Sequence, residues 1–304
     1  MKFKIIFSAA EKESRHEAAA RFVISRKPKP TRSLVLIHFP ARNMTLSYYN
    51  DQFDLHCGDL VFVDGKLEGF RGHVVDVCYT FKINLSDYKR VISVADTKVH
   101  GEFHFAGSHF VTFDRSALPY EQVITWFKAP EKEDTEIVSE QDGSGFQLND
   151  LQTMKISDAI AERGHDYYRE NRVRYISLDK TRVRAIVEGT QPYELECDYI
   201  DGEIRNLVCD CFCTYACKHM FAAMLQLKET LTFIEKHYPG RFEESRYFAA
   251  VCKEMLLNTA MAGRETGRRE FLSCFSLIFR AFPAFCFSVI RCADHKKRPF
   301  FIQR

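Results

Sequence analysis

Five side chains that can bind metal or undergo redox chemistry fall within eleven consecutive positions of this chain: Cys209, Cys211, Cys213, Cys217 and His219. Thiolate sulfur and imidazole nitrogen are donors that Zn²⁺ favours, and four of them complete the tetrahedral shell of a structural site. The same side chains would also suit a redox centre or a disulfide cluster. Composition and local context have to decide among these three chemistries.

The number and spacing of the cysteines favour a metal site over a disulfide cluster or a redox centre. The chain has 304 residues and eleven cysteines, and the seven outside the cluster are scattered singly, which is not the pattern of a disulfide framework. The first residues carry only a short apolar run interrupted by Lys4, too brief for a secretory signal. We therefore expect a cytoplasmic, reduced protein, in which clustered thiols more often hold metal than form disulfides. No C-x-x-C spacing occurs in the cluster, which disfavours a redox centre.

The cluster lies between a predicted strand, which ends in EIRNLVCDC, and a predicted helix, which begins at KHMFAAM. In an extended C-x-C both side chains leave the same face, so Cys209 and Cys211 can reach one ion. Cys217 and His219 can do the same where a loop turns into the first helical turn. Because Cys213 continues the two-residue alternation, four ligands have to be drawn from five candidates.

The pattern C-x-C, five residues, C-x-H resembles the SWIM zinc finger, and the resemblance covers about residues 151–230, including the G-x-x-Y element that starts at Gly164. It implies one structural Zn²⁺ held by Cys209, Cys211, Cys217 and His219, with Cys213 spare. It also implies a non-catalytic module that binds DNA or a protein, in families that often accompany helicase-like motors. No motor, nucleophile elbow or dinucleotide fingerprint occurs in this chain, so we expect no enzyme, and a motor encoded separately is one candidate partner.

Four arginines are the candidates for contact with nucleic acid: Arg172, Arg174, Arg182 and Arg184. On two adjacent strands they would line up on one side, as a phosphate-tracking stripe does. Against this, residues 151–230 hold 11 Lys and Arg and 13 Asp and Glu, whereas nucleic-acid modules are usually basic. The arginines would equally suit a solvated sheet face. The sequence leaves DNA and a protein partner undecided.

We expect an α+β protein of four segments. Residues 1–128 form a β-rich domain, a small barrel or meander with a hairpin at Asp64-Gly65; residues 129–150 form an acidic linker; residues 151–230 form the zinc-finger module, with a helix break at Gly164; residues 231–304 form a helical region. Residues 242–263 read as one amphipathic helix. The apolar run at 271–290 contains Arg280 and Pro283, so we expect a buried or partner-covered helix rather than a membrane span; an altered reading frame near residue 270 is the other explanation.

An enzyme active site in the N-terminal domain is the alternative of a different class. In the run VHGEFHFAGSHF, residues 99–110, alternation predicts His100, Glu102 and His104 on one solvent-facing side and the intervening phenylalanines turned inward. Two imidazoles and a carboxylate can bind a metal, but nothing nearby completes the set. The residues that would carry a reaction are Asp76, His100, Glu102 and His109.

Overall fold

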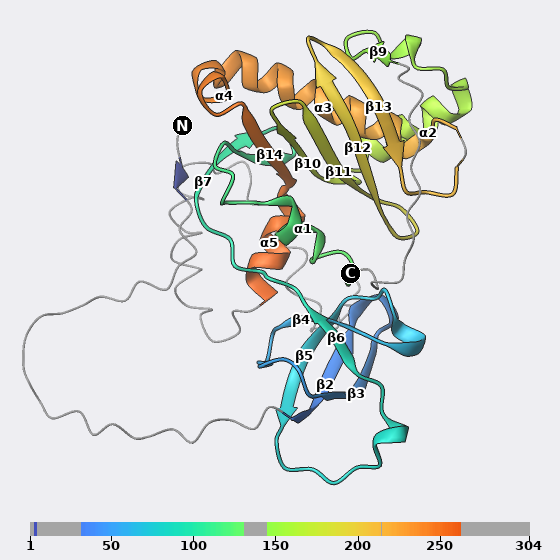
Figure 1. Ribbon diagram of the computed structural model, residues 1–304, viewed down its shortest axis with the longest axis vertical. Helices are drawn as coiled ribbons and strands as arrows, with labels where there is room; N and C mark the ends of the chain where they lie inside the picture. The colour runs from blue at the N-terminus through green and yellow to red at the C-terminus, as the bar shows by residue number, and fades with distance from the viewer. Residues whose placement is uncertain (1–2, 5–31, 131–144, 214, 263–304) are drawn as a thin grey trace, which may run out of the picture. The chain divides into compact units, whose positions relative to one another are not determined.

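The computed structural model describes residues 3–4, 32–130, 145–213 and 215–262 of the chain. These residues form two antiparallel sheets and several helices, which confirms the α+β class (Figure 1). The apolar run at 271–290 lies outside the described residues. Among the helices that the structure describes, none combines the length and apolar character needed to cross a bilayer.

Five strands form the smaller sheet, in the order β3-β2-β5-β4-β6. Their bounds are β2 (Ser33–Phe39), β3 (Met44–Asn50), β4 (Leu60–Val63), β5 (Gly72–Cys78) and β6 (Val91–Val94). In β2 every second residue is buried, so Val35, Ile37 and Phe39 face the core. An isolated parallel bridge joins Tyr49 of edge strand β3 to Arg90, just before edge strand β6. The smaller sheet is therefore open, and a single bridge between Tyr49 and Arg90 links its two edges.

Strands β4 and β5 do pair as consecutive antiparallel strands, as the hairpin signal at Asp64-Gly65 predicted, but residues 64–71 connect them, so the loop is longer than a two-residue turn. Gly65, at φ 87°, instead begins the short 3₁₀ helix η2 (Gly65–Leu67). The Asp64 carboxylate accepts a hydrogen bond from the backbone N–H of Arg90 at 2.6 Å. Asp64 therefore fastens the loop to the approach to β6 and does not close a tight turn.

Nine strands form the larger sheet, in the order β1-β7-β8-β14-β10-β11-β12-β13-β9. Every neighbouring pair is antiparallel. The bounds are β1 (Phe3–Lys4), β7 (Glu102–Ala106), β8 (His109–Thr112), β9 (Gly145–Gln147), β10 (Val173–Asp179), β11 (Arg182–Glu188), β12 (Pro192–Ile200), β13 (Glu203–Cys209) and β14 (Tyr247–Cys252).

Helices and turns complete the described chain: α1 (Tyr120–Ile124), α2 (Asp158–Arg169), α3 (Lys218–His237), α4 (Pro239–Ser245), α5 (Lys253–Ala262), η1 (Pro40–Arg42), η3 (Leu85–Asp87) and η4 (Leu151–Thr153). Helix α3 packs along β10 to β13, and α2 packs on α3 (Figure 1). Alternate residues of the central strands enter two separate cores. Ile176 and Ala250 pack under α3, whereas Tyr175 and Val251 pack with Trp126 and its neighbours on the opposite face. Both faces of the sheet are covered there.

The helix predicted over residues 242–263 is wrong: the structure has the end of α4, then strand β14, then α5. Strand β14 pairs with β8 on one side and β10 on the other, and all six of its residues are buried. A strand buried on both faces shows no alternation of polar and apolar residues. Its two alanines therefore gave the run a helical composition that the tertiary structure overrides.

The predicted linker at 129–150 is described only at its ends. Residues 131–144 lie outside the described residues, and residues 145–147 form β9, which pairs with β13. Strands β7 and β8, from before this segment, share one sheet with β10 to β13 and with β14, from beyond residue 230. The division into independent segments stays a prediction, and the sheet connects strands from three of them.

The helix break predicted at Gly164 is wrong: Gly164 lies inside α2 and is buried. A Cβ at this position would lie 2.7 Å from Phe221 Cδ1 and 3.1 Å from the Lys218 carbonyl oxygen. Only a residue without a side chain lets α2 approach the first turn of α3 this closely. The glycine therefore sets the distance between the two helices next to the cysteine cluster.

Substituting Gly164→Ala should lower the free energy of unfolding by about 1–3 kcal/mol, because overpacking outweighs the gain in helix propensity. Chemical denaturation measures the change. Gly240→Ala in α4 is the matched control, since a Cβ there meets nothing within 4 Å, and it should leave stability unchanged or slightly raised. A Gly164→Ala protein as stable as the wild type would contradict this account of the helix pair.

Candidate metal centre

The cysteine cluster sits where strand β13 gives way to helix α3. Cys209 is the last residue of β13 and pairs opposite Leu195 of β12. Cys217 is the N-cap of α3, with extended backbone angles of −119° and 169°, and its carbonyl accepts the backbone N–H of Phe221. The change from strand to helix within eight residues brings both pairs of donors to one place, as expected from the sequence.

The donor atoms of Cys209, Cys211, Cys217 and His219 all lie within 4.8 Å of one another. His219 Nδ1 is 3.6 Å from Cys217 Sγ and 3.9 Å from Cys209 Sγ. In a tetrahedral zinc site with Zn–S near 2.3 Å and Zn–N near 2.0 Å, a sulfur and a nitrogen are roughly 3.5 Å apart. The four residues therefore have the donor types and spacing for one metal ion, and three of them are buried.

The imidazole of His219 is oriented by rings rather than by a second hydrogen bond. It stacks on Tyr193, with centroids 4.3 Å apart and planes at 25°, and Tyr167 lies 5.5 Å away. Its Nε2 is buried and has no hydrogen-bond partner among the described residues. A Cβ on Gly189 would lie 3.2 Å from that nitrogen and 2.8 Å from the Tyr193 ring. Tyr193 and Gly189 thus hold Nδ1 of His219 toward the sulfurs. The sequence did not identify these two residues as part of the site, because nothing in their spacing along the chain indicates it.

The three thiols compete for protons. Contact with the Cys209 thiol, supported by His219 and the Met220 backbone N–H, lowers the pKa of Cys217. The same contact raises the pKa of Cys209, and burial raises the pKa of Cys211. Cys217 also stands at the N-terminus of α3, where the helix dipole favours an anion. Cys209, Cys211 and Cys217 could hold a divalent cation together, which would relieve this competition because each sulfur would bind it as a thiolate.

Asp210, between the first two cysteines, ties the cluster to the neighbouring strand. Its Oδ1 accepts the Glu194 backbone N–H at 2.9 Å, and its own N–H donates to the Glu194 carbonyl at 3.1 Å. Lys128 forms ion pairs with the side-chain carboxylates of Glu194 and Asp210, and its Nζ lies 3.8 Å from Asp210 Oδ2. These contacts hold the end of β13 on β12, so that Cys209 and Cys211 keep their places after the sheet ends.

Cys213 is exposed and lies outside the group of four donors. It belongs to the loop between the two ligand pairs, in which Phe212 is 91% exposed and Tyr215 85% exposed. The loop between the two pairs of candidate ligands therefore carries two aromatic side chains into solvent. That Cys213 is spare stays a prediction, which substitution tests.

The four arginines proposed for nucleic acid all have carboxylate partners. The shortest contacts are Arg172–Glu170 at 2.5 Å, Arg174–Glu188 at 2.5 Å, Arg182–Glu196 at 2.8 Å and Arg184–Glu121 at 2.9 Å. The register of β11 and β12 places Arg182 opposite Asp198 and Arg184 opposite Glu196, as cross-strand charge pairs. Their role in DNA binding stays a prediction.

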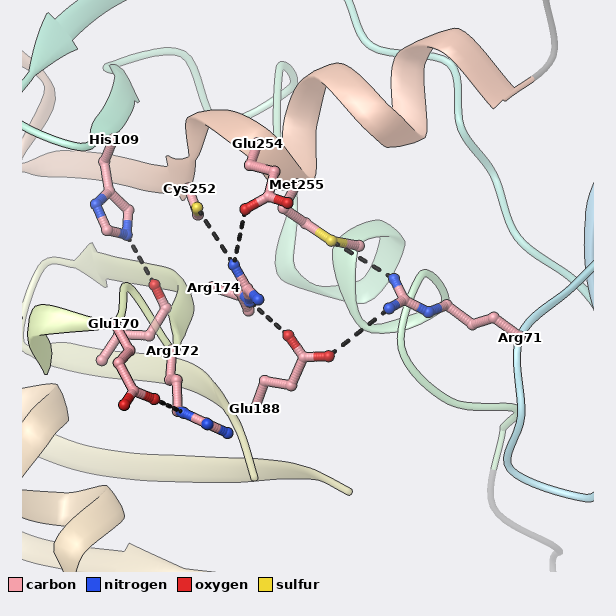
Figure 2. A network of polar contacts seen from close by, with 10 residues as sticks. Arg71, His109, Glu170, Arg172, Arg174, Glu188, Cys252, Glu254 and Met255 are labelled. Atoms are coloured by element: carbon pink, nitrogen blue, oxygen red, sulfur yellow. Dashed lines mark hydrogen bonds and ion pairs between the residues drawn. The ribbon is translucent and has the colours of Figure 1, made fainter. Parts of the chain in front are cut away.

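Glu188 connects Arg174 to a second arginine, as Figure 2 shows. Its other oxygen lies 3.8 Å from Arg71, which also donates to Met255 Sδ at 3.5 Å. Burial lowers the pKa of Arg71, and Glu188 opposes that shift. Arg174 donates as well to Cys252 Sγ at 3.6 Å. Arg174 is therefore held in place by Glu188 and Cys252.

The residues of the alternative enzyme site are only partly brought together. Glu102 and His104 line a pocket of about 350 Å³ and lie 3.8 Å apart, and Glu102 also binds Arg241 at 3.0 Å. Neither Asp76, on β5, nor His109 lines that pocket. His109 is buried, its Nε2 lies 2.8 Å from the Val173 carbonyl, and burial lowers its pKa to about 4. His100 is exposed.

The predicted facing of β7 is wrong for two residues. His104 is 1% exposed, against the rings of Phe113 and Tyr238, whereas Phe105 is 37% exposed. The sequence assigned the polar residues to solvent because it could not show that Tyr238, at the end of α3, covers this side of the sheet.

Zinc binding should distinguish the cysteines. Cys213→Ser should bind one zinc with an affinity near that of the wild type, because its side chain lies outside the donor group. Cys217→Ser should lose the ion and lower the melting temperature, because it removes a buried thiolate ligand. Competition with a chromogenic chelator measures both. Equal loss in the two variants would overturn the ligand assignment.

Zinc loading should release about two protons from the thiols at neutral pH, because the pKa values of Cys209 and Cys211 are raised whereas that of Cys217 is lowered. Since protons compete with the metal, zinc affinity should fall as the pH falls. Titration calorimetry in buffers of different ionisation enthalpy counts the protons. Release of none would contradict this distribution of charge among the thiols.

No family model, curated protein or solved structure matches this chain. The resemblance to the SWIM zinc finger therefore rests on the ligand pattern and its context alone, and what the structure supports is a group of three cysteines and one histidine that could hold a metal ion.

Proposed function

We propose that this chain is a SWIM-type zinc protein, in which one structural Zn²⁺ supports a non-catalytic surface for binding a protein partner. The single observation that carries the proposal is the gathering of four donor atoms within 4.8 Å at the strand-to-helix junction. Three thiolates and one imidazole are a complete ligand set for a closed tetrahedral site. Zinc, rather than a harder cation, suits sulfur donors of this kind.

A structural role fits the donor count better than a catalytic one. Catalytic zinc keeps one coordination position for water or substrate, whereas four protein ligands leave none. Cys217 and His219 are also buried, with exposures of 3% and 4%. Binding of a structural zinc is worth about 10–16 kcal/mol of apparent free energy in small fingers, so removal of the ion should loosen the junction of β13 and α3.

Phe212 and Tyr215 supply the proposed binding surface. Aromatic side chains that are 91% and 85% exposed are unusual on a folded protein, and buried aromatic anchors dominate the affinity of many interfaces. Both residues lie between Cys211 and Cys217 in the sequence, so a bound ion would fix both ends of the loop that presents them. Prior ordering of a binding loop reduces the entropy lost when a partner binds.

A protein partner is favoured over DNA by the charges around the site. The arginines of β11 are matched by acids of β12, and Asp210 adds a carboxylate between two ligand cysteines. A zinc ion with three thiolates also carries a net negative charge. Phosphate groups would therefore meet few unpaired cations here. DNA binding is the second candidate, because Arg174, Arg182 and Arg184 lie on the adjacent strands β10 and β11.

The double substitution Phe212→Ala and Tyr215→Ala should abolish capture of the partner without loss of zinc, because anchor residues typically contribute about 2 kcal/mol or more each. The measurement is affinity purification of the tagged full chain from native lysate, with nuclease, followed by quantitative mass spectrometry. Leu85→Ala, at an apolar side chain 45% exposed elsewhere, is the matched control and should retain the partner.

Two results would contradict the proposal. Proteins captured equally by the wild type and the double variant would remove the loop from the binding surface. DNA affinity that falls steeply with salt, measured on the purified chain, would favour the second candidate instead.

A further inference from the structure

The turn between β11 and β12, residues 189–191, lies against the candidate metal ligand His219. A Cβ on Gly189 would lie 3.2 Å from His219 Nε2, so the backbone of the turn closely approaches the imidazole. The hydroxyl groups of Thr190 and Tyr193 are 2.9 Å apart, which ties the turn to the ring that stacks on His219. A displacement of the turn would therefore move both the ring and the backbone that orient this ligand.

Glu188, the last residue of β11, anchors this turn with its backbone and its side chain. Its N–H donates to the Arg172 carbonyl at 2.8 Å, and one carboxylate oxygen lies 2.5 Å from Arg174 Nε. The other carboxylate oxygen lies 3.8 Å from Arg71 Nη2, so the side chain sits between two guanidinium groups (Figure 2). Because Glu188 directly precedes Gly189, its placement fixes where the turn begins.

The two arginines come from different parts of the fold. Arg174 lies on β10, which pairs with β11, so its contact with Glu188 joins neighbouring strands. Arg71 directly precedes β5 of the smaller sheet. It is oriented by a hydrogen bond to Met255 Sδ at 3.5 Å and by the Phe127 ring, whose centre lies 5.8 Å from its guanidinium carbon. Through Arg71 the smaller sheet therefore contacts the residue that precedes the turn at the metal centre.

We propose that Arg71 is a positioning residue for the metal centre: through Glu188 and the turn that follows, the smaller sheet helps to hold His219 in its binding orientation. The inference rests on the proposed zinc site and assigns its regulation to the smaller sheet. Groups that orient a metal-binding histidine affect metal affinity although they do not touch the ion. Because coupling between two sites is reciprocal, a partner that displaces Arg71 would change zinc affinity, and zinc would change the affinity for that partner.

A double-mutant cycle on the full chain is the first test. Arg71→Gln should weaken zinc binding by about threefold to fivefold, the most that a partly exposed ion pair supports; the two side chains are 36% and 31% exposed. Glu188→Gln loses both arginine contacts and should weaken zinc binding by about tenfold. The two substitutions together should do no more than Glu188→Gln alone, because Arg71 acts through that carboxylate. Competition with a chromogenic chelator measures each affinity, and circular dichroism checks that each variant is folded.

The visible absorption of the Co²⁺-loaded chain is the second readout, because its bands report the arrangement of the four donors rather than the stability of the fold. The bands should differ from those of the wild type in Arg71→Gln. Arg42 supplies the matched control, since its guanidinium carbon lies 4.7 Å from the centre of the Phe70 ring and the ion pairs of Glu188 do not involve it. Arg42→Gln should keep the zinc affinity and the cobalt spectrum of the wild type.

Three results would overturn the proposal. An Arg71→Gln chain with the zinc affinity and cobalt spectrum of the wild type would remove Arg71 from the metal centre. Losses of affinity that add in the double variant would show that Arg71 does not act through Glu188. A wild-type chain that binds no zinc would contradict the proposed function as well, so failure of the zinc site and failure of its coupling to the smaller sheet are distinguishable.

Discussion

The contact on which the fold depends is the meeting of three sulfur atoms and one imidazole nitrogen between the end of β13 and the start of α3. Cys209 is held in the sheet by its pairing with β12, and Cys217 begins the helix that covers the same sheet. An ion bound by both therefore joins two layers of the fold at one point. The free energy available from such an ion, about 10–16 kcal/mol, equals the whole stability of a typical domain, about 5–15 kcal/mol.

Two further features surround this junction: glycines that allow close packing, and charge pairs on the neighbouring strands. Gly164 lets α2 lie against the first turn of α3, and Gly189 makes room for the stacked rings of Tyr193 and His219. The acids of β12 neutralise the arginines of β11, so the neighbouring sheet face has little charge to offer a polyanion. The exposed aromatic side chains of Phe212 and Tyr215, between the candidate ligands, are the contrasting feature, and the proposed function assigns them to an apolar surface of a partner.

The local parts of this fold were readable in the sequence, and the long-range parts were not. The strand before Cys209, the helix after Cys217 and the pairing of donors by C-x-C and C-x-H depend on neighbouring residues, and the structure agrees with them. Strand β14 has no alternation because it is buried on both faces. The burial of His104 depends on Tyr238, and the orientation of His219 depends on Tyr193; both partners are brought near only by tertiary packing. Gly164 was misread for the same reason.

X-ray absorption at the zinc edge of the purified chain is the most direct test of the metal centre. This account predicts one zinc per chain with three sulfur ligands near 2.3 Å and one nitrogen near 2.0 Å. A shell of four sulfurs would place Cys213 in the site instead of His219, and a bound oxygen would indicate an open, catalytic ion. Either result, or a folded protein without metal, would contradict the central claim.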